Sequence, residues 1–341
     1  MAFYTIKTVD NKKLWDDFLK KHPEANFLQS WEWGEFHLAL GKKIQRTGFY
    51  HEEILSGVML SIVENARRGR YLTVPGGPII DWNVKIFVNL FVKTIRQFAS
   101  DNNCVFIRVR PQLLSEDFSK KLFKMHGFIP APIHLHAELT NQLDISVSEE
   151  QLLANMRKAT RYEIKKAISQ KITIKTSTDP DDIRTFYELQ LLTAQRQKFI
   201  PFSFKFLYEQ FKVFAAAKKS LLYSAEFEGK LLAQAIIIFF NGEADYHYGA
   251  STNDGRNYPG AYLIQWEAIK EAKKRGIKKY NFWGVAPPES FNHRFSGVSI
   301  FKRGFAGVDV EYLHAHDLVI NSWKYSLNLL VEKLRKKMRH V

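Results

Sequence analysis

Two stretches of the chain repeat one another, and this duplication limits the fold more than any other feature. The first is HEEILSGVMLSIVENARRGRYLTVPGG and the second is EFEGKLLAQAIIIFFNGEADYHYGAST; Leu55 corresponds to Leu232 and Tyr71 to Tyr248, each 177 positions later. Each copy reads as a strand, a turn, an apolar strand, a second turn and a strand that ends in an aromatic residue and glycines. A chain of 341 residues is also too long for one ordinary core. We therefore predict two similar units.

Both copies also have the same neighbours along the chain. Each is followed by a helix and a strand, KIFVNLFVKTIRQFAS before CVFIRV and AYLIQWEAIKEAKKRG before KKYNFWGV. Helical segments precede each hairpin, WEWGEFHLAL in the first half, and DIRTFYELQLLTAQRQ and SFKFLYEQFKVFAAAKK in the second. Helices, antiparallel meander, helix and strand is the order of an N-acetyltransferase-like α/β unit. The predicted fold class is α/β (α+β), with two such domains in tandem and mixed, mostly antiparallel sheets.

Charge and cysteine content narrow the classes of partner. The formal net charge is +15, from 50 Lys and Arg against 35 Asp and Glu, which predicts attraction for nucleic acid, nucleotide phosphates or an acidic membrane leaflet. The single cysteine, Cys104, excludes an intrachain disulfide and a cysteine metal site. The longest apolar run, LLAQAIIIFF, is too short to span a bilayer, and MAFYTIKTVDNKKLW is unlike a secretion signal. We expect a cytoplasmic protein, with peripheral contact to the inner face of an anionic membrane left open.

Seven stretches, in order along nearly the whole chain, resemble the Fem family of tRNA-dependent aminoacyltransferases: FLQSWEWGEF, YLTVPGGPIID, NMRKATRYEIKKA, LLTAQRQKF, YHYGAST, AYLIQWEAIKEAKKRGIKKYNFWG and SIFKRGFAGVDVEY. That family builds the side branch of the peptidoglycan stem peptide with two tandem acetyltransferase-like domains. Because no sustained heptad repeat is visible, the chain resembles the short form without a coiled-coil arm. The resemblance implies an acceptor-binding first domain, residues 1–146 plus 318–341, and a second domain, 147–317, on the tRNA side of the catalytic groove.

The C-terminal segment reads as a helix with one apolar side. Its stripe at three- and four-residue intervals comprises Ile320, Trp323, Leu327, Leu330, Leu334 and Met338. The resemblance implies that this helix packs back on the first domain, which gives the stripe a place to dock. The basic run EKLRKKMRH suits the negative end of such a helix, with membrane or tRNA contact as the alternative.

The implied reaction moves an aminoacyl group from a tRNA ester to an amine on the stem peptide of UDP-MurNAc-pentapeptide or lipid II. A lysine-type amine has a pKa of ~10.4 and must lose a proton, and the tetrahedral intermediate needs positive charge or hydrogen-bond donors. By resemblance, Lys302 lies at the catalytic groove and steadies the tRNA terminus or the oxyanion, with Phe301 as a wall. The alternative is that Lys302 and Arg303 are solvated charges on an edge strand. The resemblance implies no cofactor and no metal, and we expect a monomer.

Further residues are assigned to the two substrates. Arg196 matches a family arginine that contacts acceptor phosphate, a role suited to a planar bidentate donor. Tyr246 and Tyr248 alternate along a strand, and we expect one to face the groove and the other the core. His37 stands near the position of a family lysine, and Gly76 stands where family members commonly have an arginine. His37, Tyr246 and Tyr248 join Arg196 as predicted acceptor-binding residues.

A basic helix at the domain junction is the predicted tRNA-binding surface. Arg157, Arg161 and Lys165 are four residues apart along one side, with Lys158 adjacent, and Arg303 is added from the C-terminal motif. The alternative is an ordinary solvated helix face.

Three other interpretations are weighed. His134 and His136, like His314 and His316, are spaced to share one side of a strand, but no convergent carboxylate or cysteine is visible, so no metal site is predicted. An acyl-CoA-dependent N-acyltransferase needs a glycine-rich turn entering a helix, and GRNYPGAYL has imperfect spacing and a proline. A non-catalytic protein that binds RNA or cell-wall precursors is the third.

Overall fold

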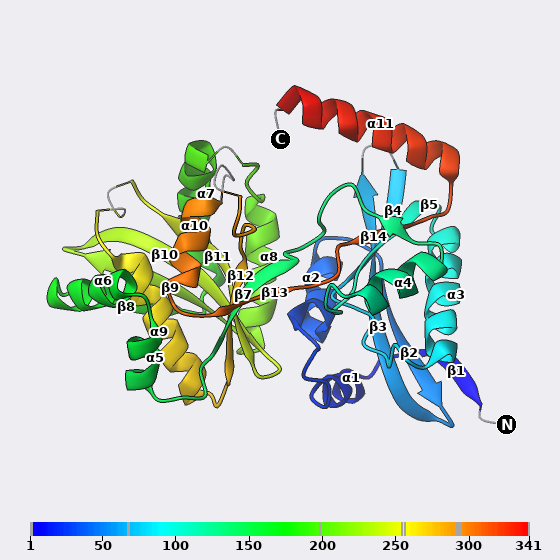
Figure 1. Ribbon diagram of the computed structural model, residues 1–341, viewed down its shortest axis with the longest axis horizontal. Helices are drawn as coiled ribbons and strands as arrows, with labels where there is room; N and C mark the ends of the chain where they lie inside the picture. The colour runs from blue at the N-terminus through cyan, green and yellow to red at the C-terminus, as the bar shows by residue number, and fades with distance from the viewer. Residues whose placement is uncertain are drawn as a thin grey trace. The chain divides into compact units, whose positions relative to one another are not determined.

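The computed structural model describes residues 3–66, 69–197, 199–253, 255, 257–290 and 295–339. The chain divides into two compact units, Met1–Glu138 with Glu311–Val341 (unit 1) and Leu139–Val310 (unit 2). The predicted boundaries, after residues 146 and 317, lie eight and seven residues later along the chain. Each unit contains one seven-stranded sheet with helices on it (Figure 1).

The two sheets have the same plan. The unit 1 sheet runs in the order β1 (Tyr4–Thr8), β2 (Ile44–His51), β3 (Ile54–Ala66), β4 (Gly69–Pro75), β5 (Cys104–Arg110), β14 (His316–Val319) and β6 (Ile129–Pro130). The unit 2 sheet runs in the order β8 (Thr173–Ser177), β9 (Ser220–Phe227), β10 (Lys230–Phe240), β11 (Glu243–Ser251), β12 (Lys279–Gly284), β7 (Leu139–Asp144) and β13 (Val308–Glu311). Pairs β4–β5 and β11–β12 are parallel, whereas the meanders before them are antiparallel. The mixed, duplicated fold predicted from the repeat is confirmed.

The helices also correspond. Unit 1 contains α1 (Lys12–Leu19), a 3₁₀ turn (Phe27–Gln29), α2 (Trp31–Ala39), α3 (Lys85–Asp101), α4 (Asp117–Met125) and α11 (Ser322–Arg339). Unit 2 contains α5 (Glu149–Asn155), α6 (Lys158–Ser169), a 3₁₀ turn (Pro180–Asp182), α7 (Ile183–Gln197), α8 (Phe204–Ala216), α9 (Gly260–Lys274) and α10 (Ser296–Arg303). As the repeat predicts, α3 links the parallel pair of unit 1 and α9 that of unit 2.

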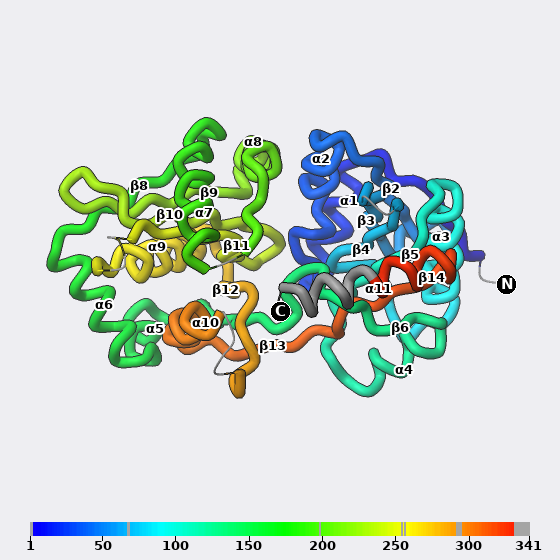
Figure 2. Tube along the Cα trace, turned by 90° about the horizontal axis from the view of Figure 1, so that it is seen from above, coloured from blue at the N-terminus to red at the C-terminus, as the bar shows by residue number. Residues whose placement is uncertain are grey.

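Each sheet is covered on both faces. In unit 1, α3 and α4 enclose a core with Phe49, Leu72 and Ile107, and α1 and α2 pack on β2 and β3 (Figure 2). In unit 2, the core beneath α6 and α9 includes Ile237, whereas Ile236 belongs to the core beneath α7 and α8. A strand buried on both faces needs a continuous apolar run, which is why β10 reads LLAQAIIIFF.

The C-terminal helix α11 packs on unit 1, as predicted, but not through the predicted stripe. Tyr325 is buried against Phe106, with ring centroids 5.4 Å apart, and its hydroxyl donates to Asp317 at 2.8 Å. Trp323, by contrast, is 76% exposed, and Leu327 and Leu330 are half exposed or more. Tyr325, which packs α11 on unit 1, comes two positions after Trp323 and lies on another side of the helix. Most of the described stripe therefore faces outward. The side chains of Leu334 and Met338 lie outside the described residues.

Candidate functional site

Most of the segment SIFKRGF is helical, so it does not form the edge strand of the alternative interpretation. Helix α10 ends at Arg303, and Phe301 and Phe305 pack against Tyr262 of α9. These two phenylalanines are four residues apart, a helical spacing from which the helix could have been predicted. The edge-strand alternative for Lys302 and Arg303 is therefore wrong. Phe301 forms part of an aromatic wall within unit 2.

Lys302 is buried, with 8% of its surface exposed. Its Nζ donates to the carbonyl oxygen of Gly284 at 2.7 Å and lies 5.5 Å from the ring centroid of Tyr246. Among the residues that the structure describes, no carboxylate forms an ion pair with it. Burial lowers the pKa of Lys302 from 10.5 to about 7, so the ammonium and amine forms coexist near neutral pH. Such a group can donate a proton or carry a charge without leaving its place.

A β-bulge places Tyr246 and Tyr248 on opposite faces of the sheet. In β10 the consecutive residues Ile236 and Ile237 pair with Tyr248 and Tyr246, and the irregularity lies between them. Tyr246 faces α6 and α9 and meets Lys302, and burial raises its pKa to about 12. Tyr248 packs beneath α7 and α8, and its hydroxyl donates to Gln210 at 3.2 Å.

A buried acidic pair, Glu243 and Asp245, lies at the junction of β11 and β12. It was not predicted from the sequence. The Glu243 carboxylate accepts from Asn281 at 2.7 Å and forms an ion pair with Lys279. Asp245 is almost completely buried, and burial, followed by the charge of Glu243, raises its pKa well above the usual value. Burial therefore favours the neutral form of Asp245. The only sequence signal was the alternation of acids in GEADYHYG.

Arg196 holds the end of β11. From the last turn of α7 its guanidinium donates to Asn253 Oδ1 at 2.8 Å and to Ser251 Oγ at 3.3 Å. The side chain is half-buried. Its predicted contact with acceptor phosphate stays a prediction.

His37 lies in unit 1 and is closed off from solvent. The ring is buried between Trp33 and Phe36, 5.1 and 4.7 Å away between ring centroids. Burial, with the charge of Lys42, lowers the pKa of His37 to about 2, so the ring is neutral at physiological pH. A buried neutral ring offers little to a ligand, and its acceptor-binding role stays a prediction.

The backbone conformation at position 76 favours a glycine. Its φ is +64°, and a Cβ there would lie 2.7 Å from Asn26 Oδ1. This geometry explains why an arginine is absent at this position.

The predicted tRNA-binding cations fall into two groups. Arg161 caps the C-terminal end of α5 by donating to Ala154 O at 2.8 Å, and Arg303 forms an ion pair with Asp309, its Nη2 donating to Oδ2 at 2.6 Å and its Nε to Oδ1 at 3.2 Å. Arg157 is exposed next to Gly304, to which its backbone donates. Lys158 and Lys165 are exposed and seven residues apart, hence on one face of α6.

Tyr162 belongs to the same face and was not predicted. It is 62% exposed and follows Lys158 by four residues and precedes Lys165 by three. An exposed aromatic ring between two cations on one helix face is suited to stacking and phosphate contact.

The glycines considered for a CoA site serve packing. A Cβ at Gly255 would lie 2.1 Å from the carbonyl oxygen of Leu232, and one at Gly260 would lie 2.9 Å from Ala225 Cβ. Neither has a positive φ, so close approach to strands β9 and β10 accounts for both. Arg256 lies outside the described residues.

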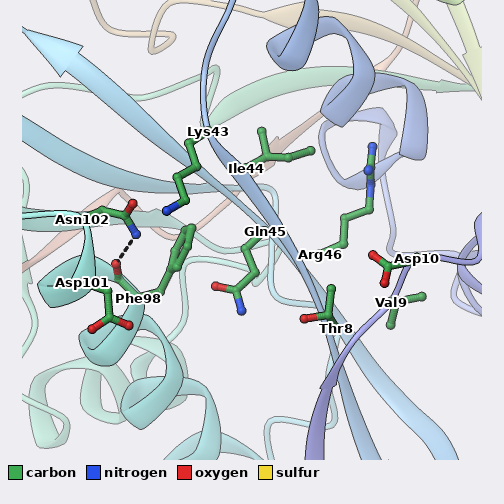
Figure 3. A pocket seen from close by; sticks show the side chains of 10 residues that line it. All are labelled: Thr8, Val9, Asp10, Lys43, Ile44, Gln45, Arg46, Phe98, Asp101 and Asn102. Carbon is green, nitrogen blue, oxygen red and sulfur yellow. Dashed lines mark hydrogen bonds between the residues drawn. The ribbon is translucent and has the colours of Figure 1, made fainter.

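A separate polar hollow of about 440 Å³ lies in unit 1 between β1, β2 and the C-terminal end of α3 (Figure 3). Lys43, Arg46, Asp10 and Asp101 bring both signs of charge to its lining. None of the predicted site residues lies there.

Comparison with known protein families identifies one whose model matches most of the chain. The FemAB family model matches residues 11–128, 134–231 and 219–333. The chain belongs to the FemAB family. Its relatives include "Aminoacyltransferase FemA" of Staphylococcus epidermidis, 20% identical over 95% of this chain and 98% of the relative. "Lipid II:glycine glycyltransferase" of Staphylococcus aureus is also 20% identical, over 92% of each chain.

Solved structures show the same fold as this FemAB-family chain. A structure titled "Crystal structure of FemX" matches with a TM-score of 0.84 at 17% identity, over 95% of this chain and 99% of that one. A tandem GNAT protein from the clavulanic acid biosynthesis pathway matches with a TM-score of 0.59 at 12% identity, over 94% and 98%. The tandem N-acetyltransferase-like architecture and the Fem resemblance predicted from the sequence are both confirmed.

Proposed function

We propose that this FemAB-family aminoacyltransferase moves an amino acid from aminoacyl-tRNA to an amine on the stem peptide of a peptidoglycan precursor, at a site in unit 2 around Lys302. The buried Lys302, held by Gly284 O and beneath the Tyr246 ring, carries the proposal. Relatives named as aminoacyltransferases support the reaction class.

The transfer reaction needs stabilisation of an oxyanion and exchange of a proton, and the site around Lys302 can supply both. The acceptor nitrogen bonds to the ester carbonyl carbon, the bond to the ribose oxygen breaks, and the proton lost by the amine ends on that oxygen. Lys302 in its ammonium form stabilises the oxyanion or steadies the tRNA terminus. Because its pKa is about 7, it also exchanges a proton readily at neutral pH.

The donor contacts unit 2 through the exposed face of α6, which we define as Lys158, Tyr162 and Lys165. Two lysines supply the sequence-independent attraction for phosphates, and the ring supplies a stacking surface. Arg157 lies one residue before α6 and adds a third cation.

The acceptor is lipid-linked in this proposal, because one relative is named for lipid II and the outward side of α11 fits a membrane. Trp323, Leu327 and Leu330 are exposed on this helix, and the sequence EKLRKKMRH that follows them is strongly basic. Apolar residues beside a basic run suit the interface of an anionic bilayer. None of the helices in the described ranges is long and apolar enough to cross a membrane. The protein would act as a monomer at the cytoplasmic face.

The first experiment measures transfer of radiolabel from a panel of aminoacyl-tRNAs to lipid II and to UDP-MurNAc-pentapeptide, with acetyl-CoA as a parallel donor. Label that moves from one tRNA to either acceptor supports the reaction and identifies both substrates. Label that moves from acetyl-CoA alone establishes the acyltransferase alternative, and binding of tRNA without transfer establishes the non-catalytic one.

Membrane contact is tested separately by sedimentation with vesicles of anionic phospholipid. Trp323→Ser with Leu330→Ser should weaken binding at least ~10-fold, whereas Ile54→Ser, a 69% exposed apolar residue of the same unit, should leave it unchanged. Equal binding by all three proteins would remove α11 from the interface.

A further inference from the structure

Three potential metal ligands meet in unit 1, from two segments that are far apart in sequence. Glu138 Oε2 lies 2.5 Å from His134 Nδ1 and 2.7 Å from His314 Nδ1. All three ligand atoms lie within 4.8 Å of one another. The convergent carboxylate that the sequence did not reveal is therefore present, contributed by a residue four positions after His134. Neither histidine lies in a strand.

The neighbours of this His134–Glu138–His314 cluster orient two of the ligands. His314 Nε2 lies 2.7 Å from the carbonyl oxygen of Ala131, and because a carbonyl only accepts, Nε2 carries the proton. Nδ1 faces the Glu138 carboxylate, which also only accepts, so in the metal-free cluster Nδ1 carries a proton as well, and a metal ion bound at Nδ1 would displace it. The second oxygen of Glu138 accepts from the backbone N–H of Ala315 at 2.8 Å. Histidine ligands of metals are usually held in this way, by donation of the other ring N–H to a carbonyl.

Burial and exposure are also arranged as a metal site requires. Glu138 is 8% exposed, whereas the side chain of His134 is 74% exposed and reaches the cluster from the solvent side. The exposed side of the cluster therefore gives an ion an entry path from solvent. Ligand atoms around a tetrahedral zinc ion are ~3.3 Å apart, given bonds of ~2.0 Å, so the imidazoles need to move outward by less than ~1 Å. The exposed His134 is free to make this movement.

The other histidine of each pair, His136 or His316, makes different contacts and lies outside the cluster. His136 is half-buried near Trp33, 5.9 Å away between ring centroids, and His316 Nδ1 pairs with the backbone oxygen of His314. The cluster thus uses one histidine from each pair.

We propose that His134, Glu138 and His314 bind one divalent transition-metal ion, zinc in the first instance, with water in the remaining position. Two imidazoles and a carboxylate are a usual ligand set for zinc. Glu138 is the last residue before the chain enters unit 2, and His314 follows its return at Glu311. The bound ion would therefore cross-link the outgoing and returning segments, a structural role independent of the transfer reaction.

The test uses the full-length protein, stripped with a chelator and titrated calorimetrically with Zn²⁺ and spectroscopically with Co²⁺. We expect one ion per chain, with the visible absorption of cobalt in a low-symmetry nitrogen and oxygen site. His134→Ala should weaken binding at least ~10-fold and, because this side chain is exposed, should leave the fold intact.

The matched control is His22→Ala. His22 also pairs with a glutamate, 3.0 Å from Glu24, but the structure gives that pair no third ligand among the described residues. Its binding should equal that of the wild type. Zinc should also raise the Tm of the wild type and of His22→Ala but not of His134→Ala. Equal affinity of wild type and His134→Ala, or the absence of stoichiometric binding to the wild type, would overturn the proposal.

Discussion

At the scale of the residue, the buried Lys302 lowers the stability of the folded chain. The proposed function explains why a lysine is nevertheless present at this position. In the unfolded chain its pKa is 10.5 and in the folded chain about 7. Between these values the unfolded state binds a proton that the folded state lacks, so stability rises with pH across the window and the full penalty applies below pH 7. Functional sites commonly keep such destabilising groups.

Replacement of Lys302 should therefore change activity and stability in opposite directions. Lys302→Met should lower transfer at least ~100-fold, the usual cost of losing a donor to an oxyanion. It should raise the free energy of unfolding at pH 7 by up to about 4 kcal/mol, a gain that shrinks toward pH 10. Urea unfolding at pH 7 and 9, beside the transfer assay, checks both. A variant that loses both stability and activity would indicate a packing role instead.

A second residue-scale prediction concerns Gly76. Gly76→Ala should lower the free energy of unfolding by more than Gly229→Ala, because both have a left-handed φ but only the first places a Cβ against other atoms. The conformation alone costs ~1 kcal/mol, and the contact with Asn26 adds to it. Equal values in urea unfolding would show that the Asn26 side chain moves aside without cost.

At the scale of the element, α6 carries both the exposed lysines that we propose bind tRNA, Lys158 and Lys165, and an arginine that stabilises the fold, Arg161. Lys158→Ala with Lys165→Ala should weaken tRNA binding and reduce the slope of log affinity against log salt by about 2, with little change in stability. Arg161→Ala should instead lower stability by ~1 kcal/mol, because it removes the donor at the end of α5. Lys230→Ala, an exposed lysine of β10, is the control. Filter binding of tRNA at several salt concentrations measures this slope. An unchanged slope in the double variant would show that tRNA binds another surface.

At the scale of the whole molecule, unit 1 depends on the end of the chain. Strand β14 lies between β5 and β6, and its Asp317 forms a bidentate ion pair with the buried Arg108, at 2.7 Å for both contacts. Tyr325 of α11 donates to the same carboxylate. Strand β14, which follows the return of the chain to unit 1 at Glu311, therefore completes a sheet that β1 begins.

Asp317→Ala should lower the stability of unit 1 by ~3–5 kcal/mol, because it leaves the Arg108 charge buried without a partner. Asp309→Ala removes an acid from the Arg303 pair of unit 2, whose side chains are about a quarter exposed, and should cost ~1 kcal/mol or less. Because the units have separate cores, hydrogen exchange should show the loss in unit 1 strands alone. A similar loss of protection in both units would contradict this.

The repeat and the family motifs were enough to predict the duplicated fold, since hairpin turns and apolar strands are local signals. The positions Lys302 and Phe301 also came from the motif, but their helix did not, because SIFKRGF has few residues and its packing partner Tyr262 is about 40 positions away. The outward stripe of α11 was mistaken for a buried one because periodicity shows that a helix has an apolar side and not which side meets the protein.

By itself, then, the sequence determined the tandem architecture, the family and the order of the elements, because these follow from patterns that neighbouring residues carry. Only the tertiary structure decided the environment of each group: the burial that lowers the pKa of Lys302, the bulge that separates Tyr246 from Tyr248, the pairing that occupies Arg303, and the meeting of His134, Glu138 and His314. Each of these depends on which distant segments come into contact, and burial, charge pairing and convergence are properties of those contacts.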